Sequence, residues 1–125
     1  MSGRVVHFEL PADDVKRAGE FYQTVFGWDI NPVPDVNYVL VVTTPSGETG
    51  PTEPGAINGG MAERSSPITA PVITIEVDEI SRALEQVEAA GGAVVQGKQP
   101  VGAMGFTAYF SDTEGNVVGL WQNAL

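Results

Sequence analysis

The stretches VVHFEL (residues 5–10) and APVITI (residues 70–75) open two segments of this chain that stay in step through a strand, a helix and a glycine. Five positions at one constant offset are identical, and they fall at a helix cap, within a helix and at a helix stop: Asp13/Asp78, Arg17/Arg82, Ala18/Ala83, Glu20/Glu85 and Gly27/Gly92. A shared offset at structurally distinct positions predicts a duplicated supersecondary unit.

Composition limits the classes of protein to consider. The chain has 125 residues, the size of one ordinary domain, and no cysteine, which excludes disulfides, thiolate nucleophiles and sulfur-ligated zinc. Six basic against 16 acidic residues give a formal charge of −10, which disfavours nucleic acid and anionic membrane surfaces as partners. The N-terminus does not resemble a signal peptide and no apolar run approaches the roughly 20 residues of a membrane span. We therefore expect a cytoplasmic protein.

The first copy is expected to contain one helix and four strands. Residues 5–10 suit a strand that ends at Pro11, and Asp13 or Asp14 can cap a helix whose left-handed stop is Gly27. The helix's apolar positions recur at helical spacing: Val15, Ala18, Phe21, Tyr22 and Val25. Further strands are predicted over residues 29–33, 38–44 and 57–63. Residues 45–56, with three prolines and three glycines, are predicted to form a mobile loop without a regular ladder.

The second copy repeats this order. A strand over residues 71–77 leads to a helix capped by Asp78 and stopped by Gly91-Gly92. Three strands are predicted after the helix, over residues 93–96, 106–111 and 117–122, with a hairpin turn at residues 112–116. The prediction is thus an α+β fold of two tandem β-α-β-β-β modules, residues 4–63 and 71–122, joined by a linker at 64–70. Two such modules set side by side would form an eight-stranded cleft that could hold a ligand.

Three segments in this order resemble the vicinal oxygen chelate superfamily: His7-Phe8-Glu9-Leu10, the run from Asp14 to Trp28, and the closing stretch from Asp112 to Leu120. That superfamily includes glyoxalase I, extradiol dioxygenases, methylmalonyl-CoA epimerase and bleomycin-binding resistance proteins. The resemblance covers essentially the whole chain. It implies paired modules, an eight-stranded cleft, often a homodimer and, in the enzymes, a divalent metal held by cleft side chains.

The residues at the superfamily's usual metal positions argue against a metal here. Strand alternation turns His7 and Glu9 toward the cleft, and His7 occupies the position of the first metal-binding histidine in the enzymes. The matching position of the second copy is Val72, and the place of the usual glutamate in the last strand is Gly119. Useful affinity needs three or four convergent donors. We therefore predict no metal and no other cofactor.

A non-standard metal site is an alternative. His7, Glu9 and Glu76 form an adequate set of donors by number. Glu76, however, lies four residues beyond Val72, about 13 Å at strand rise, so the three would need an unrelated geometry.

The expected ligand contacts are mainly aromatic and small residues on the cleft side of their strands. Trp121 shares a strand face with Gly119, and Tyr109 is favoured over its neighbours Phe106 and Phe110 because a phenol tolerates a wet pocket. Trp28 is expected to cover the core. The full predicted ligand-binding set is His7, Glu9, Tyr38, Gly60, Tyr109, Gly119 and Trp121.

Three functions remain open at this point. The first is a metal-free protein that binds a planar or partly apolar small molecule. The second is an enzyme of the lyase, isomerase or dioxygenase type, with His7 as general base or with a non-standard metal site. The third is an interaction module whose cleft has decayed.

Overall fold

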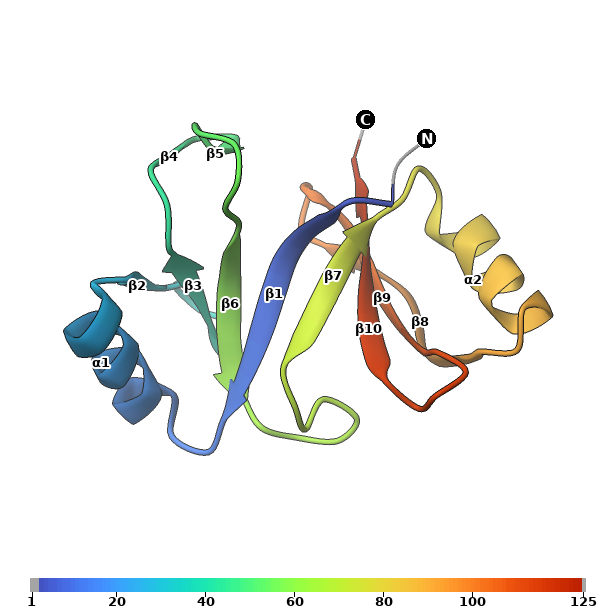
Figure 1. Ribbon diagram of the computed structural model, residues 1–125, viewed down its shortest axis with the longest axis horizontal. Coiled ribbons are helices and arrows are strands. Elements are labelled where there is room, and N and C mark those ends of the chain that lie inside the picture. The colour runs from blue at the N-terminus through green and yellow to red at the C-terminus, as the bar shows by residue number, and fades with distance from the viewer. Residues whose placement is uncertain (1–2, 125) are drawn as a thin grey trace. The chain divides into compact units, whose positions relative to one another are not determined.

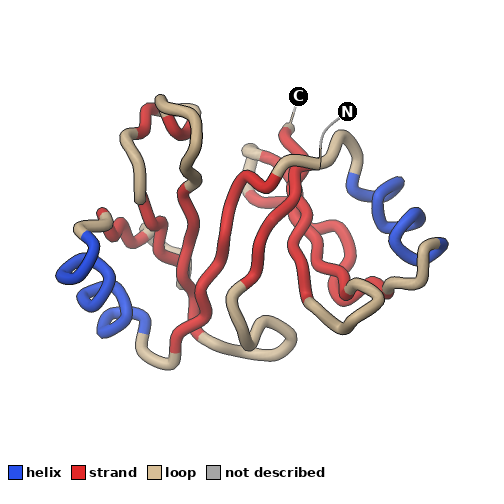
Figure 2. Tube along the Cα trace, in the orientation of Figure 1, coloured by secondary structure: helices blue, strands red, loops and turns tan. Residues whose placement is uncertain are grey.

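The repeated strand-helix pattern is present twice in the computed structural model, which describes residues 3–124 (Figure 1). These residues divide into two compact units, residues 7–71 and residues 3–6 together with 72–124. Each unit carries one helix and four principal strands, in the order β-α-β-β-β (Figure 2). The predicted α+β architecture of two such modules is therefore confirmed.

The sheet of the first module has the strand order β2-β3-β6-β1. Its strands are β1 (Val5–Ala12), β2 (Asp29–Pro32), β3 (Tyr38–Val42) and β6 (Asn58–Glu63). From His7 onward β1 runs parallel to β6, whereas β3 is antiparallel to both β2 and β6. Pro11 does not end β1 as expected, because it pairs with Ala62 near the strand end, where one missing N–H is tolerated.

Residues 45–56 are more regular than predicted. Strands β4 (Ser46–Gly47) and β5 (Gly50–Pro51) form a two-residue antiparallel ladder. The Asn58 amide donates to the Ser46 hydroxyl at 2.8 Å. The proline and glycine content therefore shortens the ladder but does not abolish it.

Helix α1 (Val15–Phe26) begins and ends where the sequence predicts. Asp14 is the N-cap and its carboxylate accepts a hydrogen bond from the backbone N–H of Arg17 at 3.0 Å. Gly27 ends the helix with φ 74°, in the left-handed region. Gly19, the buried position of the helix, faces Ile30 of β2, and a methyl group there would meet that side chain at 3.0 Å.

Aromatic side chains fill the space between α1 and its sheet. Trp28 stacks on Tyr22, with ring centroids 4.8 Å apart and planes 7° from parallel, and it also contacts Phe8 and Phe26. The expectation that Trp28 covers the core agrees with this packing. Phe21, one of the apolar positions that recur along the helix, is 55% exposed rather than buried against the sheet.

The second module has the strand order β7-β10-β9-β8. Its strands are β7 (Val72–Glu76), β8 (Ala93–Val101), β9 (Gly105–Ser111) and β10 (Val117–Asn123). β8 is much longer than the predicted 93–96, because two register shifts carry its pairing with β9 past Gly97 and Pro100. The predicted turn before β10 is held by Asp112, whose carboxylate accepts backbone hydrogen bonds from Glu114 and Asn116.

Helix α2 (Ile80–Ala89) is capped differently from the prediction. The N-cap is Glu79 rather than Asp78, and its side chain makes no capping hydrogen bond. The Gln122 side-chain oxygen accepts the hydrogen bond from the Ile80 N–H at 2.8 Å. A residue of β10 therefore caps this helix in place of the N-cap side chain. The core beneath the helix consists of Ile80, Leu84, Ala108 and Leu120.

No helix in the described part of the chain is long and apolar enough to cross a membrane.

Candidate functional site

His7 and Tyr38 form a hydrogen-bonded pair in the first module. Nε2 of His7 lies 2.9 Å from the Tyr38 hydroxyl, and both side chains are partly buried. His7 alternates along β1 with Phe8, whose ring packs against Trp28 on the helix side. The pair therefore lies on the face of the sheet that α1 does not cover, as strand alternation predicted.

Both members of the pair are held in their uncharged forms. Burial lowers the pKa of His7, because it penalises the imidazolium. Burial is also the main cause that raises the pKa of Tyr38 well above its ordinary value of 10, and the negative charge of Glu9 raises it further. At neutral pH the pair is a neutral imidazole beside a protonated phenol. Beyond their mutual hydrogen bond, the two side chains offer one further donor and one further acceptor to a ligand but no fixed charge.

The Tyr38 ring lies against the backbone of Gly60, which has no side chain to displace it. Gly60 is the register partner of Glu9, and a methyl group at Gly60 would overlap with the ring and hydroxyl of Tyr38. The phenol of Tyr38 therefore occupies the space over the Gly60 backbone. A ligand on this face would meet the Tyr38 ring, and the absence of a side chain at Gly60 lets that ring lie close to the sheet.

Four predicted site residues, His7, Glu9, Tyr38 and Gly60, are thus brought together in the first module. The other three belong to the second module, where Tyr109 and Gly119 form a cluster and Trp121 lies further along the same strand face. Gly119 pairs with Tyr109, and a methyl group at Gly119 would lie 3.4 Å from the tyrosine ring.

The core of the second module shows which way this cluster points. Ala108 and Leu120, the neighbours of Tyr109 and Gly119 along their strands, pack under α2. The cluster therefore faces away from that helix.

Thr74 is a member of this cluster that sequence reasoning missed. Its side chain is 5% exposed, and its hydroxyl has no hydrogen-bond partner among the described residues. That hydroxyl would lie 3.0 Å from a methyl group at Gly119. The duplication offered a signal for it, because Thr74 stands at the repeat position of Glu9. The two modules therefore place a polar group at the same point of their first strands.

Trp121 is held by a polar chain along one edge of the second module. Its indole N–H donates to the Asn123 side-chain oxygen at 2.7 Å, and the Asn123 amide donates to Glu76 at 3.1 Å. Arg4 completes the chain through an ion pair with Glu76 at 3.0 Å. The hydrogen bond from Arg4 is the main cause that lowers the pKa of Glu76. The indole is thus fixed in orientation, with its ring over Gly105.

The residues present do not fit a bound divalent metal. Val72 is 3% exposed and has no donor atom, and Gly119 has no side chain. Nε2 of His7 already bonds Tyr38, and Glu76 already bonds Arg4 and Asn123. Among residues 3–124 no three histidine or acidic side chains gather closely enough to hold a metal. The chemistry of the site is that of hydrogen bonds and aromatic surfaces.

Paired β-α-β-β-β modules are the fold of proteins of the glyoxalase and bleomycin-resistance type, which this chain resembles. A family model described as bleomycin resistance protein-like N-terminal matches residues 4–44. A glyoxylase-like domain-containing protein of Didymella fabae is 29% identical over 118 residues, which cover 93% of this chain and 91% of that protein.

Solved structures share the fold at low identity. A hypothetical protein, BH1468 of Bacillus halodurans, superimposes with a TM-score of 0.67 at 14% identity, over 100% of this chain and 97% of that one. A variant of Streptomyces coelicolor methylmalonyl-CoA epimerase, in complex with 2-nitronate-propionyl-CoA, gives 0.66 at 14% identity over 99% and 96% of the two chains. All three kinds of comparison point to the vicinal oxygen chelate superfamily, and the resemblance predicted from the sequence is confirmed.

Proposed function

We propose that this protein binds a planar or partly apolar small molecule without a metal. The ligand would rest on the Tyr38 ring, with His7 and Glu9 as polar anchors. Tyr109 and Trp121 give the second module an aromatic surface of its own. The observation that carries the proposal is the hydrogen bond between His7 and Tyr38. It engages Nε2 of His7, one of the two ring nitrogens through which an imidazole binds a metal, and it joins an aromatic surface to a polar group.

The electrostatics of the pair narrow the class of ligand. A neutral imidazole and a protonated phenol favour a ligand with both a hydrogen-bond acceptor and a donor on an aromatic or flat apolar frame. Glu9 disfavours an anionic group beside Tyr38, since its charge already opposes the phenolate. Neutral or cationic planar molecules are the preferred candidates, and bleomycin is a natural first probe because the family model carries its name.

Binding can be measured by calorimetry with bleomycin and a panel of planar metabolites. Tyr38→Phe removes the hydroxyl and keeps the ring, and we expect about fivefold weaker binding or more, the value of one net hydrogen bond. Tyr22→Phe is the matched control, because Tyr22 stacks on Trp28 on the helix side. Trp121→Ala tests the second module's own aromatic surface, and it should weaken a ligand bound there by about 1 kcal/mol or more. Equal effects of Tyr38→Phe and Tyr22→Phe would argue against this site.

Metal dependence is a separate measurement. Protein purified without chelator should contain no stoichiometric iron, manganese, zinc or nickel by elemental analysis, and chelator should leave ligand affinity unchanged. A near-stoichiometric metal that His7→Gln removes would overturn the metal-free proposal and restore the non-standard metal site.

An enzyme that uses His7 as general base is the second candidate. The observation that favours it is that burial keeps the imidazole unprotonated at neutral pH, with the Tyr38 hydroxyl poised beside it. Turnover of a ligand found in the binding screen, lost in His7→Gln while binding is retained, would support this candidate. A screen without any ligand would instead favour an interaction module.

The homodimer and the cytoplasmic location expected from the sequence stay predictions. Light scattering coupled to size-exclusion chromatography measures the first of them directly.

A further inference from the structure

A groove on the other face of the first module is independent of the His7 site. It has a volume of about 460 Å³, within the range of small-molecule sites. Leu10 and Met61, register partners on β1 and β6, form its floor. Because Leu10 alternates with Glu9, this floor faces α1 rather than the His7 side. The groove is lined by Leu10, Pro11, Ala12, Asp13, Asp14, Arg17, Ala18, Phe21, Tyr22, Met61, Arg64 and Pro71.

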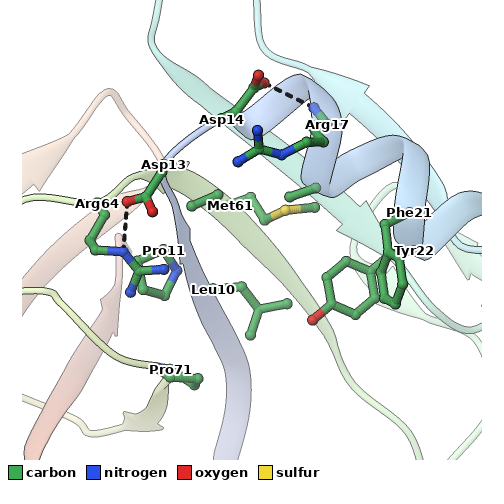
Figure 3. A pocket seen from close by; sticks show the side chains of 12 residues that line it. Leu10, Pro11, Asp13, Asp14, Arg17, Phe21, Tyr22, Met61, Arg64 and Pro71 are labelled. Atoms are coloured by element: carbon green, nitrogen blue, oxygen red, sulfur yellow. Dashed lines mark hydrogen bonds and ion pairs between the residues drawn. The ribbon is translucent and has the colours of Figure 1, made fainter.

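The groove has a charged end and an aromatic end. Figure 3 shows Asp13, Asp14 and Arg64 gathered at one end and Phe21 and Tyr22 at the other, with Met61 and Leu10 between them. The aromatic pair meets edge to face at a centroid distance of 5.2 Å. Phe21 is 55% exposed, an apolar surface left open at the groove's edge. A ligand that fits this lining has an apolar body and one polar end.

The charged side chains of the groove differ in whether they already have partners. Asp13 bonds Arg64 at 2.9 Å, and Asp14 is occupied by the backbone N–H of Arg17. Arg64 also donates to the Thr69 carbonyl at 2.5 Å. The guanidinium of Arg17 has no hydrogen bond or ion pair within the described part of the chain. A free guanidinium favours a carboxylate, which it can bind through two parallel hydrogen bonds.

The aspartates limit the charge of that ligand. Asp13 and Asp14 line the same groove as Arg17, and the whole chain carries a formal charge of −10. A dianion such as a phosphate monoester would be repelled more strongly than a singly charged carboxylate. We therefore propose that the groove between α1 and β1/β6 binds an aliphatic or aromatic monocarboxylate, with Arg17 on the carboxylate and Phe21 against the apolar body.

Titration of the full chain with octanoate, followed by amide chemical shifts in ¹H–¹⁵N NMR spectra, tests the proposal. Octan-1-ol is the uncharged comparison. We expect saturable shifts at groove residues such as Ala18 and Phe21, and octanoate should bind at least about tenfold more tightly than octan-1-ol, the value of a charge-assisted pair. Arg17→Gln should remove that preference. Lys16→Gln, on the same helix but outside the groove, should keep it.

The apolar half of the groove has its own matched pair of variants. Phe21→Ala should weaken octanoate by about tenfold, whereas Phe26→Ala should not, because Phe26 is 62% exposed on the same helix and does not line the groove. His7→Gln should leave octanoate binding unchanged, so failure here is distinguishable from failure of the His7 site. Shifts that map away from the groove, or equal affinity for octanoate and octan-1-ol, would overturn the proposal.

Discussion

Nε2 of His7 and the hydroxyl of Tyr38 lie 2.9 Å apart on the helix-free face of the first module. The two residues are far apart in the sequence and meet because β1 and β3 both flank β6. Burial favours the uncharged form of each side chain. A single hydrogen bond between neutral partners therefore organises the candidate site, and its properties can be measured one at a time.

The first prediction concerns pH. The pKa of folded His7 lies below its ordinary value of 6.5, so between the two values the unfolded chain binds more protons. The contribution of His7 to stability is therefore fully present above about pH 6.5 and is lost as the pH falls toward the folded pKa.

Urea unfolding of the natural protein and of His7→Gln from pH 5 to 8 measures this contribution. The natural protein should lose more stability than the variant below about pH 6.5. Parallel pH profiles would mean that folding does not perturb the imidazole.

Gly60→Ala should destabilise the first module. A methyl group there would overlap with Tyr38, so the ring must move and its hydrogen bond to His7 must break. We expect a loss of about 1–3 kcal/mol in the free energy of unfolding. Gly97→Ala is the control, because a methyl group at Gly97 has open space around it. Combining Gly60→Ala with Tyr38→Ala should recover part of the loss, and strict additivity would contradict the proposed overlap.

Thr74→Val should stabilise the second module. The Thr74 hydroxyl is buried and has no partner among residues 3–124, and valine keeps nearly the same shape without the unsatisfied group. We expect a gain of about 1 kcal/mol in urea unfolding. Thr107→Val provides the contrast, since the Thr107 hydroxyl donates to the Leu120 carbonyl at 3.2 Å and its loss should destabilise. Similar destabilisation by both changes would show that Thr74 has a partner in solution.

Gln122→Ala should weaken the start of α2. The side-chain oxygen of Gln122 satisfies the Ile80 N–H, which the N-cap residue Glu79 leaves without a side-chain partner. We expect a loss of about 1 kcal/mol, as for removal of an N-cap. Gln122→Glu keeps the acceptor and places a negative charge near the helix N-terminus, so it should preserve stability. If Gln122→Ala unfolds at the same urea concentration as the natural protein, the cross-strand cap contributes nothing.

Local signals in the sequence located the elements of both modules. Helix α1 was predictable because its cap Asp14 and its stop Gly27 act on backbone groups within a few residues. The cap of α2 was not predictable in this way. Gln122 is 42 positions from Ile80, so only the pairing of β10 in the sheet brings it there.

The length of β8 and the hairpin at residues 46–51 were missed for a related reason. Both depend on hydrogen bonds to a partner strand, and these outweigh the unfavourable local preferences of Pro100, Gly97 and the glycines of the loop. Strand propensity is therefore a weaker guide than helix capping at these positions.

The sequence by itself determined the duplication, the face on which His7 and Glu9 lie, and the missing donors at Val72 and Gly119, because these follow from residue identity and two-residue alternation. Only the tertiary structure decided that Tyr38 bonds His7 and fills the space over Gly60. It also decided that, within the described part of the chain, the buried Thr74 hydroxyl has no partner and the Arg17 guanidinium at the apolar groove is unpaired. The physical reason is the separation along the chain between the residues that interact. Alternation and capping act between neighbours along the chain, whereas burial, desolvation and the choice of hydrogen-bond partner depend on residues that only folding brings together.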